Sequence, residues 1–321
     1  MKPREQSVTA FAPGGVGNVG PGLDILGLAL AGAGDTVQAE WSETPGIQIR
    51  DPGHRELPRD PHRHTSSLAA QAVLDQAGGS HRAQRGIALT VRKGLPLSGG
   101  QGGSAASAVA GAVAVNALLG EPLDRLQLVH AALAAEETVA GRHADNIAPS
   151  LFGGIVLIRS QEPLELVHLP VPDELLVVVA HPDQRMRTAD ARAVLPAEIS
   201  RAVALHQAAQ VGAFVAALAS NDYALLGRAI DDRIAEPVRA GLLPGFREAK
   251  LAALAAGALG SSISGSGPTA FALARGPEIA KHVADAMANA YAASGQRCEV
   301  RVTKVDREGA RLVPGLQRKA Q

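Results

Sequence analysis

Apolar and polar residues alternate along several short segments of the chain, and such alternation predicts half-buried strands. The clearest of these segments are Ser7–Ala12, Thr36–Trp41, Gly86–Lys93, Gly154–Arg159, Glu165–Leu169, Thr269–Ala274 and Glu299–Val305. Leu175–Ala180 is apolar throughout and predicts a strand buried on both faces. Leu23–Leu30 is mostly apolar, and Ile47–Arg50 predicts one short strand within the polar region 42–63.

Longer segments rich in Ala and Leu follow a helical pattern. They are Ser66–Gln76, Ser104–Leu119, Leu126–Ala140 and Pro277–Ser294, with most of Ala189–Lys250. Strands and helices that alternate in this way predict an α/β protein. The chain crosses between its halves near residues 160–175, so we expect domains at 1–165 and 166–305, followed by a tail at 306–321.

Composition narrows the protein class. The chain has 321 residues, of which 46% are hydrophobic, enough for two domains with a sizeable core. Phe, Trp and Tyr number only 5, 1 and 2, so the core must be built from Ala, Val, Leu and Ile. The 31 basic and 31 acidic side chains cancel, which argues against a nucleic-acid-binding protein.

Two observations bear on the compartment. Cys298 is the sole cysteine, which excludes an intrachain disulfide and favours a small buried residue over a nucleophile. The N-terminus lacks a signal-peptide core, and the apolar stretch Ala105–Leu119 is too short to span a bilayer. We therefore expect a cytoplasmic protein that does not contact a membrane.

The sequence predicts three glycine-rich turns, at 13–22, 98–104 and 260–268, each after a strand-like segment. The most informative is Pro96–Ser107, because a helical pattern follows its glycines directly. A glycine-rich backbone lets N–H groups approach an anion, and the start of a helix adds unpaired donors and a positive dipole end. The segment lacks the Gly-Lys-Ser/Thr ending of a Walker loop, so it predicts an anion site of another design.

The first glycine-rich segment matches the dinucleotide fingerprint as Gly15-Val-Gly17-Asn-Val-Gly20. That fingerprint must open a helix, but Pro21 and Gly22 follow immediately. A loop that binds a ligand through the side chains of Asn18 and Asp24 fits better.

The polar segment His143–Pro149 lies between apolar segments and predicts a turn. Its His143 and Asp145 lack further ligands for a metal, so they either cap the turn or bind a small polar ligand with Asn146. Arg192 and Arg239 lie near predicted helix starts, and bidentate geometry makes arginine a receptor for a carboxylate.

Together these segments resemble the motifs of the GHMP kinases from about residue 8 to about residue 303. Pro13–Gly27 is similar to Pro-x-Ser-x-Ala-Asn-x-Gly-x-Gly-Phe-Asp-x-x-Gly, and Pro96–Ala106 to Pro-x-x-x-Gly-Leu-Gly-Ser-Ser-Ala-Ala. Ser264–Pro268 is the third motif, Ser-Gly-Ser-Gly-Pro. The features typical of the branch that acts on homoserine are His143–Pro149, Thr188 with Arg192, and Glu236-Pro-Val-Arg239.

The resemblance implies a two-domain α/β fold, with a left-handed βαβ crossover in the first domain and a ferredoxin-like second domain. It implies ATP as co-substrate, Mg²⁺ held by Ser104 and Glu136, and a homodimer. Because the spacing from Glu136 to His143 is one residue short for the family, Glu137 is an alternative metal ligand. The predicted ATP loop consists of Pro96, Leu97, Ser98, Gly99, Gly100, Gln101, Gly102, Gly103, Ser104, Ala105 and Ala106.

The implied substrate is L-homoserine, whose hydroxyl would receive the phosphoryl group. Asp24 would bind the ammonium, and Arg192 and Arg239 the carboxylate. The resemblance adds Asn18, His143, Asp145, Asn146, Thr188 and Gly265 to this site, and implies catalytic roles for Asp24, Ser104, Glu136 and Asp145.

Departures from the motifs keep alternatives open. Gln101 stands where the family has Leu and Gly103 where it has Ser, which predicts a looser ATP loop. There are two competing interpretations. One is a kinase for mevalonate or a sugar, and the other is an inactive relative with a binding or regulatory role.

Overall fold

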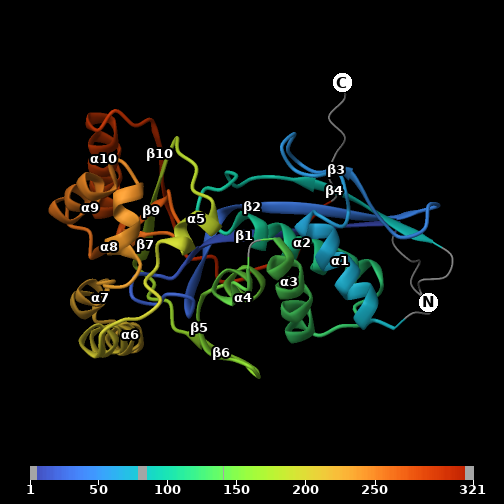
Figure 1. Cartoon of the computed structure of the whole chain (residues 1–321), viewed down its shortest axis with the longest axis horizontal. Helices are drawn as coiled ribbons and strands as arrows, with labels where there is room; N and C mark the ends of the chain where they lie inside the picture. The colour runs from blue at the N-terminus through green and yellow to red at the C-terminus, as the bar shows by residue number, and fades with distance from the viewer. Residues whose placement is uncertain (1–5, 79–84, 140, 315–321) are drawn as a thin grey trace.

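The computed structural model describes residues 6–78, 85–139 and 141–314. Figure 1 shows two sheets with helices packed against them. In the described residues the strands of the first sheet are β1 (Ser7–Gly17), β2 (Leu26–Ser42), β3 (Ile47–Asp51), β4 (Gly86–Arg92), β5 (Ile155–Gln161), β6 (Leu164–Leu169) and β11 (Arg311–Leu312).

The first sheet has the order β11-β1-β2-β4-β3, and β5 joins it through β2 and pairs with β6. β3 and β4 are parallel, and α1 (Thr65–Gln76) lies between them in the chain. The other pairs are antiparallel. The parallel pair and its helix form the βαβ unit that the family resemblance implies.

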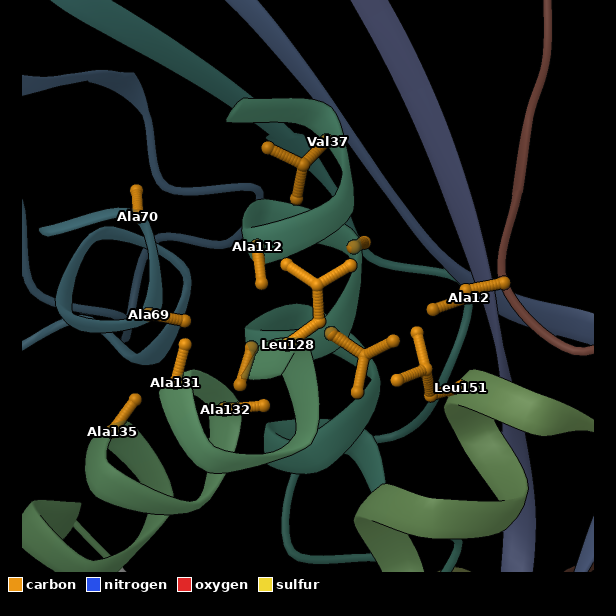
Figure 2. Packing of buried hydrophobic residues seen from close by; sticks show 14 of the residues in the cluster. Ala12, Val37, Ala69, Ala70, Ala112, Leu128, Ala131, Ala132, Ala135 and Leu151 are labelled. Atoms are coloured by element: carbon orange, nitrogen blue, oxygen red, sulfur yellow. The ribbon is translucent and has the colours of Figure 1, made fainter. Parts of the chain in front are cut away.

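Alanines line the contact between this sheet and its helices, α1, α2 (Gly103–Leu118), α3 (Arg125–Val139) and α4 (Ala144–Phe152). In Figure 2, alanines of α1 and α3 converge on α2, while Val37 and Ala12 approach from the strands. Small side chains let helices approach closely at the packing density of a protein interior. The predicted aromatic-poor core is therefore confirmed in this layer.

The second sheet has the order β10-β7-β9-β8, and all of its pairs are antiparallel. In chain order its strands thus lie 4-1-3-2, the ferredoxin-like arrangement that the resemblance implies. Its strands are β7 (Leu175–Pro182), β8 (Gly260–Ile263), β9 (Ala270–Arg275) and β10 (Cys298–Thr303). The helices of this half are α5 (Thr188–Ala193), α6 (Arg201–Ser220), α7 (Tyr223–Ala229), α8 (Glu236–Arg239), the 3-10 turn Ala240–Leu242, α9 (Phe246–Ala255) and α10 (Pro277–Ala293).

Strand β7 contributes to a core on each of its faces. Val178 and Ala180 face α9 and α10, whereas Val177 and Val179 share a second core with β2 and Phe214 of α6. This period of two explains why β7 is apolar throughout. The shared core joins the two sheets, so the walls of any cleft between them are held together.

Helix α6 is long and apolar enough to cross a membrane by length and composition, a property that the sequence analysis passed over. In the fold it packs on the core through Phe214, Ala217 and Leu218. Its Gln207 donates a hydrogen bond to the carbonyl of Pro21 at 2.8 Å. These contacts pack α6 against the core that the two sheets share.

Three expectations about local structure were wrong. His143–Pro149 is not a turn: Ala144–Phe152 forms α4, with Asp145 in its first turn, where the helix dipole favours an acidic side chain. Pro13–Gly17 and Gly260–Ile263 are strand rather than turn, because β1 and β8 pair with neighbouring strands over these residues.

The division of the chain also differs from the expectation. β6 extends to Leu169 and pairs with β5, so the break between the sheets falls between residues 169 and 175 rather than at 165. Residues 306–314 are not a tail, because Ala310 is buried and β11 pairs with β1. The rest of the predicted tail, 315–321, lies outside the described residues.

Candidate active site

Most of the residues predicted to bind substrate and ATP line one cleft of about 670 Å³, whose walls come from both halves of the chain. Those that line it are Asn18, Asp24, Pro96, Leu97, Ser98, Gly99, Gly100, Gly102, Gly103, Ser104, Glu136, His143, Asp145, Asn146, Thr188, Arg192, Arg239 and Gly265. Three members of the predicted ATP loop do not: Ala105 and Ala106 are buried in the first core, and Gln101 is buried behind the loop.

The predicted ATP loop connects β4 to α2, and three of its residues, Ser98, Gly100 and Gly102, have a left-handed backbone. Gly100 and Gly102 have φ of 74° and 67°, a conformation that glycine adopts without strain. Gly102 is the N-cap of α2 and has no side chain to cap the helix. The first N–H groups of α2 are therefore available to a ligand.

The carbonyl oxygens of the loop are held from behind. Four consecutive carbonyls accept hydrogen bonds from groups far away in sequence: Ser98 from Met186 N at 3.2 Å, Gly99 from Thr269 N at 3.3 Å, Gly100 from Ser264 Oγ at 2.6 Å, and Gln101 from Gly15 N at 3.1 Å. The N–H groups of residues 98–102 have no acceptor among the residues that the structure describes. The loop therefore keeps N–H donors free at Ser98, Gly99, Gly100 and Gly102, which line the cleft, as an anion site requires.

Ser104 and Glu136 meet at the start of α2. The Ser104 hydroxyl donates to Glu136 Oε1 at 2.6 Å, and Glu136 is 3% exposed on α3. Its second oxygen, Oε2, is buried without a hydrogen-bond partner among the described residues. Glu137 is exposed, so the geometry favours Glu136 over Glu137 as a ligand.

Asp145 is a buried carboxylate that faces the first motif. It accepts a hydrogen bond from the N–H of Asn18 at 3.1 Å, while its Oδ1 is buried without a partner in the described part of the chain. Burial raises the pKa of Asp145 to about 6, and the nearby charge of Asp24 adds to the increase, whereas His143 opposes it. The site therefore holds a carboxylate whose negative charge is poorly compensated, and such a group favours the binding of a cation next to it.

Close backbone packing places Asp145. A Cβ on Gly27 of β2 would lie 1.7 Å from the carbonyl oxygen of Asp145 and 2.9 Å from the ring of Pro149. Pro149 lacks the N–H that would bond this carbonyl in a regular helix. Glycine on the strand and proline in the helix therefore fit together and fix the depth of α4.

The two arginines differ in their surroundings. Arg192 forms a two-contact ion pair with Asp24, at 2.6 and 3.2 Å, although the resemblance assigned these side chains to different groups of the substrate. Arg239 is 4% exposed and donates only to carbonyls, those of Ala191 and Gly265, both at 3.0 Å. No carboxylate pairs with Arg239 in the described part of the chain, and burial lowers the pKa of its guanidinium.

Lys93 is a residue of the site that the sequence analysis missed. Its ammonium lies beneath the loop, forms an ion pair with Asp35, and donates to the carbonyl of Gly103 at 2.9 Å and the hydroxyl of Ser107 at 3.0 Å. The available signal was its position as the last residue of the predicted strand Gly86–Lys93, three residues before Pro96. Thr269, whose N–H and hydroxyl both bond the carbonyl of Gly99, carried no signal beyond following the third motif.

The fold of two sheets with their helices, the glycine-rich loop and the cleft together define a small-molecule kinase of the GHMP type. The family model described as GHMP kinases N terminal domain matches residues 64–154, and the one described as GHMP kinases C terminal matches residues 214–293.

Full-length relatives narrow this class. The chain is 44% identical to a homoserine kinase of Chlorobium phaeovibrioides, over 96% of this chain and 100% of the relative. It is 42% identical to a homoserine kinase of Arabidopsis thaliana, over 97% and 86%. The crystal structure of homoserine kinase from Cytophaga hutchinsonii matches with a TM-score of 0.93 and 40% identity, over 98% and 99%. The chain belongs to the homoserine kinase family of the GHMP kinases.

Proposed function

We propose that the protein transfers the γ-phosphoryl group of ATP to the side-chain hydroxyl of L-homoserine, forming O-phospho-L-homoserine and ADP in threonine biosynthesis. The observation that carries the proposal is Arg239, a buried guanidinium that lines the cleft and has no carboxylate partner among the described residues. A buried charge in this setting is matched by an anionic ligand. An amino acid supplies that anion as its carboxylate, which mevalonate also has but a neutral sugar lacks.

The remaining groups suit the other end of an amino acid. Asp24 and Asp145 provide negative charge for the ammonium of homoserine, and Asn18 lies between them through its bonds to both. The exposed pair between Asp24 and Arg192 contains the same two charges as the substrate. Homoserine can therefore replace this ion pair, with its ammonium at Asp24 and its carboxylate at Arg192, and the cost is small because exposed ion pairs are weak.

ATP fits the loop through backbone donors. The free N–H groups of residues 98–102 and the start of α2 suit the phosphates, and Lys93, paired with Asp35 beneath the loop, holds the carbonyl of Gly103. Phosphoryl transfer passes through a loose transition state, so positioning and charge neutralisation carry most of the rate.

Ser104 and Glu136 suit Mg²⁺, since both offer oxygen ligands and Glu136 Oε2 has no partner in the described residues. Bound there, the ion would neutralise charge on the phosphates of ATP. The described residues include no cluster of three or more His, Cys, Asp or Glu side chains, which suits an ion that takes its other ligands from phosphate and water.

We further propose that no single side chain is an essential general base, because the transition state needs little proton transfer. The test compares Asp24→Asn, His143→Gln and Asp145→Asn in kcat and in the affinities for both substrates. Each variant should weaken homoserine binding more than it lowers kcat. Lost turnover with unchanged binding of homoserine and ATP, in any one variant, contradicts this.

The test of the whole proposal is a coupled assay of ADP release, with homoserine, mevalonate, galactose, serine and threonine as acceptors. We expect the highest kcat/KM for homoserine, and a value at least about 100-fold lower for galactose, which has no carboxylate to pair with the buried Arg239. Preference for mevalonate or a sugar would identify another GHMP kinase. ATP binding without turnover of any acceptor would identify an inactive relative.

We also propose a cytoplasmic homodimer. The proposal is supported by α6, whose outward face is apolar and carries Leu205 at 64% exposure, in a helix otherwise anchored in the second domain. Exposed apolar surface of this kind marks protein contacts. Light scattering on wild type and Leu205→Glu tests it: a wild-type monomer at micromolar concentration contradicts the dimer.

A further inference from the structure

Gln101 departs from the family motif and lies behind the ATP loop instead of in the cleft. It is 5% exposed, and its side-chain amide bonds on both sides to the second domain. Nε2 donates to Thr269 Oγ1 at 3.3 Å, and Oε1 accepts from Arg301 Nη2 at 3.0 Å. A leucine, which the family has here, would make neither bond. The expectation of a looser loop is thus wrong for Gln101.

Arg301 is the second member of this contact. It lies on β10, half-buried, and no carboxylate pairs with it in the described part of the chain. Its other hydrogen bond goes to the carbonyl of Ala31 at 3.3 Å. Burial lowers the pKa of its guanidinium, whereas the nearby charge of Glu299 opposes this, and the two oxygens are its hydrogen-bond acceptors in the described residues. Gln101 supplies the shorter of the two bonds.

Thr269 connects the pair to the loop backbone. Its hydroxyl accepts from Gln101 and donates to the carbonyl of Gly99, whose neighbours Ser98 and Gly100 are bonded to Met186 and Ser264. The partners of all three carbonyls lie in the second domain. A loop with four glycines between residues 99 and 103 has many other conformations available, and these bonds select the one that turns its N–H groups to the cleft.

We propose that Gln101 and Arg301 form a positioning pair that holds the ATP loop against the second domain and so sets the affinity for ATP, without touching ATP. In a chain that has Gly103 where the family has serine, the pair replaces rigidity that a side-chain hydroxyl would supply. The inference rests on the proposed use of ATP and is independent of the acceptor.

The test measures ATP binding by calorimetry, and the KM for both substrates, in Gln101→Leu, Arg301→Leu and the double variant. We expect each single variant to weaken ATP binding about tenfold, the effect of losing one charge-assisted hydrogen bond. The double variant should be no weaker than the worse single variant, because the residues act as one unit. The homoserine KM should stay within about twofold, which a general loss of structure would not allow.

Two further variants complete the test. Gln101→Glu keeps an acceptor for Arg301 and should bind ATP within about threefold of wild type. Thr303→Val is the matched control: it removes a bond from β10 to the same Ala31 carbonyl, at 2.7 Å, without contacting Gln101, and should leave ATP binding unchanged.

Three outcomes would overturn the proposed positioning pair and leave the proposed function intact. They are wild-type ATP affinity in Gln101→Leu, additive losses of ATP affinity in the double variant, and equal losses of affinity for ATP and homoserine. A wild-type chain that binds no ATP would overturn both the pair and the proposed function.

Discussion

Replacement of Arg239 by alanine gives the sharpest test of how the cleft selects its substrate. Two of the guanidinium donors are already used, by the carbonyls of Ala191 and Gly265, and the remaining ones are available to a carboxylate. Truncating one member of a desolvated charged pair costs about 2–5 kcal/mol. Since about 1.4 kcal/mol corresponds to a factor of ten, the KM for homoserine should rise by about 30-fold to 4000-fold.

Arg192 provides the internal comparison. Its side chain is 40% exposed and already paired with Asp24, so the substrate gains little from it. An exposed pair contributes at most about 1 kcal/mol, which limits the increase in homoserine KM for Arg192→Ala to about fivefold. The two arginines lie in one cleft and carry the same charge. A difference between their alanine variants in homoserine KM is therefore due to the difference in burial.

The assay is homoserine saturation at saturating ATP, with homoserine carboxamide as a second acceptor. Wild type should prefer homoserine strongly, whereas Arg239→Ala should treat the acid and the amide alike. The KM for ATP should remain unchanged in both variants. An unchanged homoserine KM in Arg239→Ala, or preserved preference for the acid, would refute the assignment of the carboxylate to Arg239.

Three other predictions concern packing, pH and metal. Gly27→Ala should lower the free energy of unfolding by about 1–3 kcal/mol in urea denaturation and reduce activity, because its Cβ would meet the Asp145 carbonyl. Gly212→Ala is the control: Gly212 has open space around it, so the substitution should leave the free energy of unfolding unchanged or raise it. Because the folded state raises the pKa of Asp145 to about 6, the protonated carboxyl stabilises the fold fully below about pH 4, and this stabilisation is lost as pH rises through about 6. Relative to Asp145→Asn, the wild-type free energy of unfolding should fall by up to about 3 kcal/mol across this range. Parallel pH profiles of the two proteins would contradict the raised pKa. Glu136→Gln should raise the Mg²⁺ concentration for half-maximal activity about tenfold, because a metal ligand is lost. The exposed Glu137 is the control, and Glu137→Gln should change this concentration less than twofold. Equal shifts in the two variants would contradict the assignment of Glu136 as the ligand.

Sequence patterns predicted the helices and strands best where apolar residues repeat regularly. The helix after the ATP loop begins at Gly103, one residue before the prediction, and the buried strand of the second sheet includes all of Leu175–Ala180. Local polarity misled at residues 143–149, because a helix that starts with His, Asp and Asn and contains Pro resembles a turn. Gly27 on the opposing strand accommodates that helix, and no local pattern indicates such a contact.

The sequence by itself determined the chemistry available to this protein: a glycine-rich loop before a helix, acidic and amide side chains in two motifs, and two candidate arginines. Only the tertiary structure decided what each group does. It buried Arg239 and left Arg192 exposed, brought Glu136 rather than Glu137 to Ser104, and turned Gln101 into a contact with Arg301. The physical reason is that the sequence specifies which side chains are present, whereas their burial and partners depend on segments that are distant along the chain, by 32 residues for Ser104 and Glu136 and by 200 for Gln101 and Arg301.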